Sequence, residues 1–180
     1  MIRPRPALAI AAAALAATGS MFVTTNAQAA PQSTSTSQQA GVTLTAEQNE
    51  NARIIIGVAK GRNLSGHAQV IALATAMQES SLQNLDYGHS DSLGLFQQRP
   101  SMGWGTPEQI KDPVLSAKAF YGIAPHTSNP GLLSVAGWET MPPAEAAQAV
   151  QRSAHPDAYA KWVQLAMDTI GANPDVAPIG

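Results

Sequence analysis

Apolar residues recur with helical spacing along most of the chain, and this periodicity limits the folds that the chain can adopt. The clearest stripe has the spacing i, i+3, i+4, i+7, at Ala52, Ile55, Ile56 and Ala59. Similar stripes follow Asp112-Pro113 and Pro143, and a last stripe, which is closed by Gly171, consists of Tyr159, Trp162, Val163, Ala166 and Ile170. The alternation of apolar and polar residues that is typical of strands is hard to find. We therefore expect a mainly α fold, with at most a small hairpin in the loop 84–93.

Two segments carry the pattern of a helix N-terminus. Thr45-Ala46-Glu47-Gln48 is a candidate capping box, in which the threonine and glutamine side chains each accept a hydrogen bond from a free backbone N–H. Thr106-Pro107-Glu108-Gln109 repeats the pattern with proline at the first helical position, where its missing N–H costs nothing. We expect a helix to begin after each threonine.

The first residues have the features of an export signal. Arg3 and Arg5 provide a positive start, an alanine-rich apolar run follows, and Ala27-Gln28-Ala29 has the A-x-A pattern of a cleavage site. The run is too short and too rich in alanine to span a membrane comfortably, which takes about 20 apolar residues. We expect a signal peptide over residues 1–29, a secreted protein, and no membrane contact after cleavage. Residues 30–44, rich in Ser, Thr and Gln, then predict a disordered leader.

The composition of the remaining chain argues against several classes of protein. Removing the signal takes away two of the ten basic residues and none of the twelve acidic ones, so the net charge changes from −2 to about −4. A nucleic-acid partner is not expected, because phosphate binding needs a basic surface. Because the chain has no cysteine, buried apolar surface rather than disulfides must stabilise it. We expect one monomeric domain over residues 45–172, followed by a flexible tail over residues 173–180.

Metal, cofactor and serine-hydrolase patterns are also missing. No metal-ligand spacing relates the four histidines, which are His67, His89, His126 and His155, and no glycine fingerprint follows a strand. Ser153, His155 and Asp157 are too close in sequence to form a catalytic relay easily. We therefore expect neither a metal nor another cofactor.

Glu79 is notable because it ends a helix-like segment of small and apolar residues. In a helix over residues 67–80, Val70 and Met77 face the core, whereas Glu79 shares its face with small residues only, namely Ala68, Ala72, Thr75 and Ala76. Such a face either packs closely against another helix or lines a groove. The helix dipole and partial burial both favour the protonated carboxyl, as a general acid requires. The alternative is a solvated glutamate in a last helical turn.

Glu79-Ser80, a polar loop and Gly94-Leu95-Phe96-Gln97 together resemble the first two motifs of the lysozyme-like, soluble lytic transglycosylase superfamily. In that family a Glu-Ser pair ends a buried helix, and a Gly-Leu-Met-Gln turn lies across the cleft. Phe96 replaces the methionine with another apolar residue. The resemblance covers about residues 45–170, and the segments 91–110 and 149–162 are similar to exported lysozyme-like domains. It implies a lysozyme-like single domain, α+β with at most a small hairpin.

The resemblance also implies an enzyme that cleaves the β-1,4 MurNAc–GlcNAc linkages of peptidoglycan, with Glu79 as the catalytic acid. In a lytic transglycosylase, Glu79 would then act as the base while a muramyl hydroxyl closes an anhydro ring. Ser80 would hold the glutamate or contact substrate, and Gln97 would bind the sugar or its acetamido group. The family's third motif, Ala-Tyr-Asn-x-Gly, does not occur here; the nearest candidate is segment 153–159, from which Tyr159 is carried over as a substrate-binding residue.

Asp91 and Asp86, on the loop after Glu79, are the nearby candidates for a second carboxylate. Glycosidases with two carboxylates hold them about 5 to 9.5 Å apart on either side of the bond. Asp91 could equally be a helix N-cap, and Asp86 could shape the loop. Arg99 could pair with either aspartate or bind a carboxylate of a stem peptide. If neither aspartate faces Glu79 across a bound sugar, a single-acid mechanism is the better account.

Three other residues near these motifs are candidate substrate ligands. Trp104 stands between two glycines, where it could stack on a sugar face or close the edge of the domain. Tyr87 could line the groove or belong to a hairpin. Gln98 would contact substrate beside Gln97.

The leading hypothesis is thus a secreted, single-acid enzyme whose partner is the glycan strand of peptidoglycan. The alternative is a non-catalytic module that binds the cell wall or has a structural role on the same fold. The missing third motif motivates this alternative. Hydrolysis and anhydro-forming cleavage both need the same acid, so the sequence leaves both open.

Overall fold

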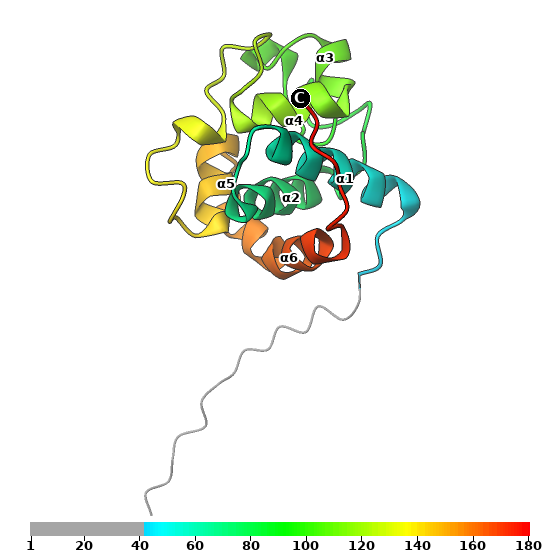
Figure 1. The fold of residues 1–180 in the computed structure, drawn as a ribbon. Helices are drawn as coiled ribbons and strands as arrows, with labels where there is room; N and C mark the ends of the chain where they lie inside the picture. Colours follow the sequence, from blue (N-terminus) through cyan, green and yellow to red (C-terminus); the bar gives the residue numbers. More distant parts are fainter. Residues whose placement is uncertain (1–41) are drawn as a thin grey trace, which may run out of the picture. The chain divides into compact units, whose positions relative to one another are not determined.

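Helix α2 (Gly66–Ser80) is the central element of the domain, and the other helices lie around it (Figure 1). The computed structural model describes residues 42–180. Within this range, α2 contacts α1 (Ala46–Gly61), α5 (Pro143–Gln151) and α6 (Val163–Ala172). Eleven of the fifteen residues of α2 are buried, so this helix is enclosed on nearly all sides.

Shorter helical elements complete the domain. They are η1 (Pro100–Met102), α3 (Pro107–Lys111), α4 (Pro113–Tyr121), η2 (Leu132–Ser134) and η3 (Pro156–Trp162), where η denotes a 3₁₀ helix. Residues 42–180 contain six α helices and no strand, which confirms the predicted mainly α, single-domain character.

The predicted helix starts are confirmed. Thr45 Oγ1 accepts a hydrogen bond from Gln48 N at 3.3 Å, and Gln48 Oε1 accepts one from Thr45 N at 2.8 Å. Thr106 and Gln109 form the same reciprocal pair at the start of α3. These signals depend only on residues within one helical turn, so sequence is enough to find them.

The hairpin expected in the loop 84–93 does not form. A single isolated bridge, Leu93 with Gln98, is present instead. The chain reverses between these two residues through Gly94 and Gln97, both with positive φ, and the N–H of Gly94 donates to Leu85 O at 2.7 Å. The backbone hydrogen bonds of Leu93 and Gly94 are therefore made within this turn and to Leu85, and not to a second strand.

The small-residue face of α2 packs against neighbouring helices rather than lining a groove. Its members, which are Ala68, Ala72, Thr75 and Ala76, are all fully buried. Side chains no larger than threonine allow the backbones of adjacent helices to approach closely. Of the two interpretations of this face, the structure therefore selects close helix packing.

The C-terminal residues 173–180, which were expected to form a flexible tail, lie along α1. The N–H of Ile179 donates to Gly57 O at 2.8 Å, and Val176 is buried. Arg53 forms an ion pair of 2.9 Å with Asp175. The departure from expectation arises because α1 has glycines where the tail crosses it, so main-chain contacts can form.

The last predicted helical stripe is divided between two elements. Tyr159 and Trp162 belong to η3, and α6 begins at Val163 and continues past Gly171 to Ala172. The predicted signal peptide and most of the predicted leader fall within residues 1–41, outside the described residues. No helix of residues 42–180 has the length and apolar character needed to cross a membrane.

Candidate active site

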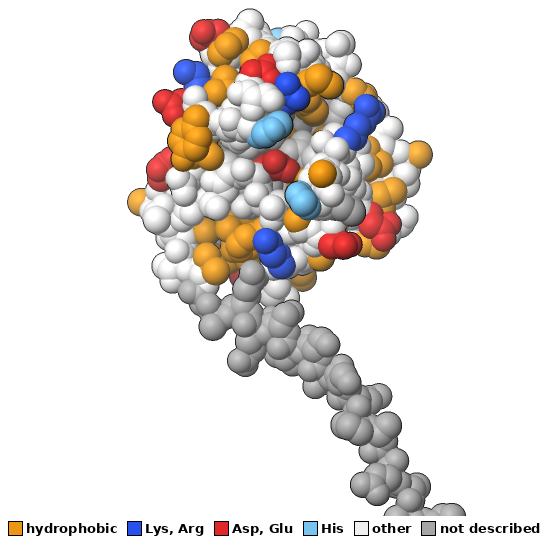
Figure 2. Space-filling model, turned by 180° about the vertical axis from the view of Figure 1, so that it is seen from behind, with side chains coloured by type: hydrophobic (Ala, Val, Ile, Leu, Met, Phe, Trp, Pro, Cys, Tyr) orange, Lys and Arg blue, Asp and Glu red, His pale blue; other side chains and the backbone are white. Residues whose placement is uncertain are grey.

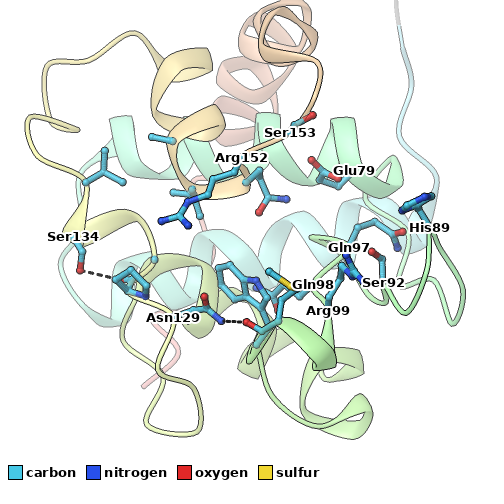
Figure 3. A pocket seen from close by; sticks show the side chains of 18 residues that line it. Glu79, His89, Ser92, Gln97, Gln98, Arg99, Asn129, Ser134, Arg152 and Ser153 are labelled. Atoms are coloured by element: carbon cyan, nitrogen blue, oxygen red, sulfur yellow. Dashed lines mark hydrogen bonds between the residues drawn. The ribbon is translucent and has the colours of Figure 1, made fainter.

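A cleft of about 520 Å³ opens on the domain, and Glu79 and Gln97 both line it (Figure 3). Its walls come from parts of the chain that are distant in sequence: the end of α2, the segments 89–104 and 129–135, and the end of α5. The resemblance implied that Glu79 faces the Gln97 turn across a cleft. The structure brings these two residues together at the same cleft.

Glu79 is held from behind by a buried tyrosine. Tyr159, in η3, donates a hydrogen bond of 2.8 Å from its hydroxyl to Glu79 Oε1. Burial, and then the charge of Glu79, raise the pKa of the Tyr159 hydroxyl, so that it remains a donor. Within the described residues Glu79 Oε2 has no hydrogen-bond partner. The carboxylate is therefore fixed through one oxygen while the residue lines the cleft.

Helix η3 also fixes the residue before Glu79. Trp162 Nε1 donates to Gln78 Oε1 at 2.9 Å. Two consecutive side chains in the last turn of α2 are thus bonded to η3, which makes that turn rigid. Tyr159 itself is buried and does not line the cleft; its hydroxyl contacts Glu79 from the core, a position that does not fit the expected contact with substrate.

Ser80 joins the end of α2 to the Gly94–Gln97 turn. Its hydroxyl lies 2.8 Å from Leu95 O and 3.1 Å from Ala76 O, and the residue is buried. Of its two expected roles, contact with substrate does not fit this position. Ser80 instead holds the turn at a fixed distance from Glu79.

Gly94 is required where the turn approaches α3. Its φ is +73°, and a Cβ at this position would lie 2.5 Å from Ile110 O. Leu95 and Phe96 are fully buried, and the Phe96 ring stacks on Phe120 with centroids 4.6 Å apart. Leu95 and Phe96 therefore anchor the turn in the core.

The Gln97 side chain is oriented by the loop before it. Its Nε2 donates to Tyr87 O at 3.2 Å and to Gly94 O at 3.3 Å. A Cβ on Gly88 would clash with Gln97 Oε1 and would lie 2.7 Å from the main-chain Ser92 O, so a side chain at position 88 would displace this amide. Gln97 thus lines the cleft in a defined orientation.

The other expected ligands separate into two groups. Trp104 and Gln98 line the cleft, and Gln98 is buried, with Nε2 donating to Ser116 O at 3.1 Å and Oε1 unpaired within the described residues. Tyr87 is 69% exposed and does not line the cleft; its main-chain carbonyl, not its ring, holds Gln97.

Neither candidate second carboxylate lines the cleft. Asp86 is exposed on the loop. Asp91 accepts from Arg99 Nε at 2.6 Å and from Ser101 N at 2.8 Å, and these contacts, Arg99 first, hold its pKa well below its usual range. No helix begins after Asp91, so the N-cap interpretation is wrong there; Asp91 ties its own loop to η1. Arg99 was expected either to pair with an aspartate or to bind a carboxylate of a stem peptide; in the structure it pairs with Asp91.

No sequence pattern indicated the residues of the opposite wall of the cleft. Asn129 Nδ2 donates to Met102 O at 3.0 Å, and Thr127 Oγ1 donates to Gly103 O at 2.6 Å. These bonds hold the loop 123–131 against the segment after Arg99. Arg152 and Ser153, at the end of α5, were also missed as lining residues. Only contacts between distant segments bring these residues to the cleft.

Basic side chains are not concentrated on the face of the domain shown in Figure 2, where most atoms are uncharged. Among residues 42–180, no group of three His, Asp or Glu side chains is arranged to hold a metal ion. No known protein family matches the chain, and no curated protein matches it.

Proposed function

We propose that the protein is an exported enzyme with a lysozyme-like fold that cleaves the β-1,4 glycan strands of peptidoglycan. One observation carries this proposal: the Glu79 carboxylate lines an open cleft, one oxygen is held by Tyr159, and the amide of Gln97 lines the same cleft. Such an arrangement suits a proton donor and a hydrogen-bonding group that orients an acetamido sugar.

The cleft favours a mechanism with a single acid. Among the described residues that line it, Glu79 is the sole carboxylate. Two-carboxylate glycosidases need a second carboxylate within about 9.5 Å to activate water or attack the sugar. Since Asp86 and Asp91 both lie outside the lining, an internal nucleophile from the substrate is the better account. We therefore propose anhydro-forming cleavage, as in lytic transglycosylases, rather than hydrolysis.

The proposed reaction balances without an added reagent. Protonated Glu79 donates its proton to the glycosidic oxygen, the bond from that oxygen to the muramyl C1 breaks, and the next sugar leaves with a free hydroxyl. The Glu79 carboxylate then takes the proton from the muramyl C6 hydroxyl. At the same time the C6 oxygen forms a bond to C1, which closes the anhydro ring. Glu79 ends protonated, ready for another cycle, and no water is consumed.

The walls of the cleft supply groups suited to a neutral polymer. Gln97 offers an amide, Trp104 an aromatic ring and Asn129 a second amide, and all three line the cleft. Aromatic rings stack on the apolar faces of sugars, while amides bond to hydroxyl and acetamido groups. These three side chains are the ligands that we assign to the glycan.

The decisive experiment is digestion of purified peptidoglycan by wild type and Glu79→Gln, with mass spectrometry of the released muropeptides. The variant should bind glycan and keep the fold but lose turnover by about 10²-fold or more, the usual contribution of a general acid. Glu139→Gln, an exposed loop position outside the cleft, is the matched control and should retain full activity.

The products separate the mechanisms and the alternatives. Anhydromuramic ends support the proposal, whereas reducing muramic ends would indicate hydrolysis. Glycan binding by wild type without any released product would favour the non-catalytic wall-binding module. A Glu79→Gln variant that digests walls at the wild-type rate would overturn the assignment of the acid.

A further inference from the structure

Arg152 has a backbone conformation that arginine rarely adopts. It is the C-cap of α5, with φ 51° and ψ 38°, in the left-handed region. Helices that end in this conformation usually place glycine or asparagine in it, because a larger residue is strained there. Strain at a non-glycine residue that lines a cleft points to a role for its side chain.

The residues on either side of Arg152 are held in place. Gln151 Nε2 donates to Phe96 O at 2.9 Å, which ties the end of α5 to the turn that carries Gln97. Gln148 Nε2 donates to Ser153 O at 2.7 Å. The main chain at Arg152 is therefore fixed, and its side chain projects from a rigid base.

The Arg152 guanidinium lies in the cleft, apart from the proposed acid. Figure 3 shows it directed away from Glu79, toward the half of the cleft where Asn129 and Ser134 lie. It forms no ion pair with any of the described residues, and it is exposed. The guanidinium thus faces the half of the cleft that lies away from Glu79.

Arg99 and Glu79, two other charged side chains that line the cleft, already have hydrogen-bond partners in the protein. Arg99 is paired with Asp91 at 2.6 Å, and Glu79 is bonded to Tyr159. The side chains opposite Arg152 are uncharged. Among the described residues that line the cleft, Arg152 is therefore the arginine without a carboxylate partner.

We infer that Arg152 is a specificity residue that binds a carboxylate carried by the glycan. The inference rests on the proposed function. A strand of amino sugars is neutral except for its carboxylates, which belong either to the lactyl group of a bare strand or to a stem peptide. A guanidinium matches a carboxylate with two parallel hydrogen bonds. Arg152 would thereby distinguish muramyl strands from uncharged glycans and set their position relative to Glu79.

The test measures binding, so that it does not depend on turnover. Glu79→Gln and the double variants Glu79→Gln/Arg152→Gln and Glu79→Gln/Arg152→Lys are titrated with soluble strands of three kinds. These are strands with stem peptides, strands stripped of peptides, and either kind with its carboxylates blocked as methylamides. Glu79→Gln/Arg62→Gln is the matched control, because Arg62 is also an exposed helix C-cap and lies outside the cleft.

Arg152→Gln should weaken binding of unblocked strands by about tenfold, while Arg152→Lys should be intermediate and Arg62→Gln should bind like its parent. Blocking the carboxylates should weaken binding by Glu79→Gln, the parent variant, by a similar factor. It should leave the affinity of the variant that also carries Arg152→Gln unchanged. If blocking weakens binding of strands with stem peptides, the carboxylate belongs to the peptide. If it weakens binding of stripped strands, the carboxylate belongs to the lactyl group.

Arg152→Gly separates a role of the side chain from a purely structural role, under which this variant would bind as tightly as its parent. Arg152→Gly should raise the melting temperature by relieving the left-handed strain, yet show the same weak binding as Arg152→Gln. Equal affinity of parent and Arg152→Gln for unblocked strands would overturn the inference and leave the proposed function intact. Failure of Glu79→Gln and of wild type to bind any strand would overturn both.

Discussion

Tyr159 and Glu79 are eighty positions apart in sequence and are joined by a hydrogen bond of 2.8 Å from the tyrosine hydroxyl to the carboxylate. The bond comes from the buried side of Glu79, because Tyr159 is fully enclosed in the core. An acid that must deliver its proton along one direction benefits from such a fixed support. The tyrosine therefore contributes to the proposed chemistry by positioning the acid.

Tyr159→Phe should separate this positioning from packing. The phenylalanine ring fills the same space, so the free energy of unfolding should fall by only about 1.5 to 3 kcal/mol, the worth of a hydrogen bond to a charged group. Loss of the positioned carboxylate should lower kcat by about tenfold to hundredfold with little change in KM. Steady-state kinetics and urea denaturation measure the two effects. Tyr87→Phe, at an exposed ring, is the control, and equal kinetics for the two variants would remove the role assigned to Tyr159.

Two buried tyrosines should make the domain sensitive to alkali. Burial raises the pKa of Tyr121, whose hydroxyl donates to Ile55 O at 3.3 Å, and burial with the charge of Glu79 raises that of Tyr159. In the unfolded chain a tyrosine loses its proton near pH 10, at about its reference value. The folded state retains these protons at higher pH, so their contribution to stability is complete below that value and falls as the pH rises.

The expected slope is at most about 1.4 kcal/mol per pH unit for each tyrosine. Urea denaturation at a series of pH values from 9 to 11 measures it. The double variant Tyr121→Phe/Tyr159→Phe should show a flatter dependence than wild type. A wild-type stability that is constant across this range would contradict the burial of both hydroxyls.

The parts of this fold that sequence could predict depend on short stretches of chain. The capping boxes at Thr45 and Thr106 each involve residues three positions apart, and both formed as expected. The Glu79 and Gln97 motifs were visible because each is a compact pattern within one turn. Their positions at one cleft followed only from the resemblance, since nothing local measures the distance between a helix end and a distant turn.

The remainder of the site depends on contacts between distant segments. Asn129 reaches the cleft because it bonds to Met102 O, and Arg152 because Gln151 bonds to Phe96 O. The small-residue face of α2 was ambiguous for a similar reason. Alanines permit both a groove and close packing, and only the presence of α5 and α6 beside them decides between the two.

Asp91→Asn tests whether Glu79 works alone. Asp91 is bonded to Arg99 and Ser101 rather than to groups in the cleft. Its loss should lower kcat by less than about tenfold, whereas a catalytic base or nucleophile would cost about 10²-fold or more. Digestion rates with Asp91→Asn and Asp86→Asn, compared with Glu79→Gln, provide the measurement. A fall in either aspartate variant to the level of Glu79→Gln would require a two-carboxylate mechanism.

The glycines of α1 should determine whether the C-terminal segment stays attached. A Cβ on Gly61 would lie 2.0 Å from Ile179 O, a main-chain atom that cannot move away without displacing the segment. Gly61→Ala should therefore lower the free energy of unfolding by about 1 to 3 kcal/mol and release the Ile179 amide, which donates to Gly57 O, to rapid hydrogen exchange. Gly171→Ala is the matched control, because a Cβ in that part of α6 meets nothing within 4 Å. It should raise stability by up to about 1 kcal/mol, since alanine is the better helix former. The same small gain from Gly61→Ala would show that the segment does not cross α1 as closely as these contacts require.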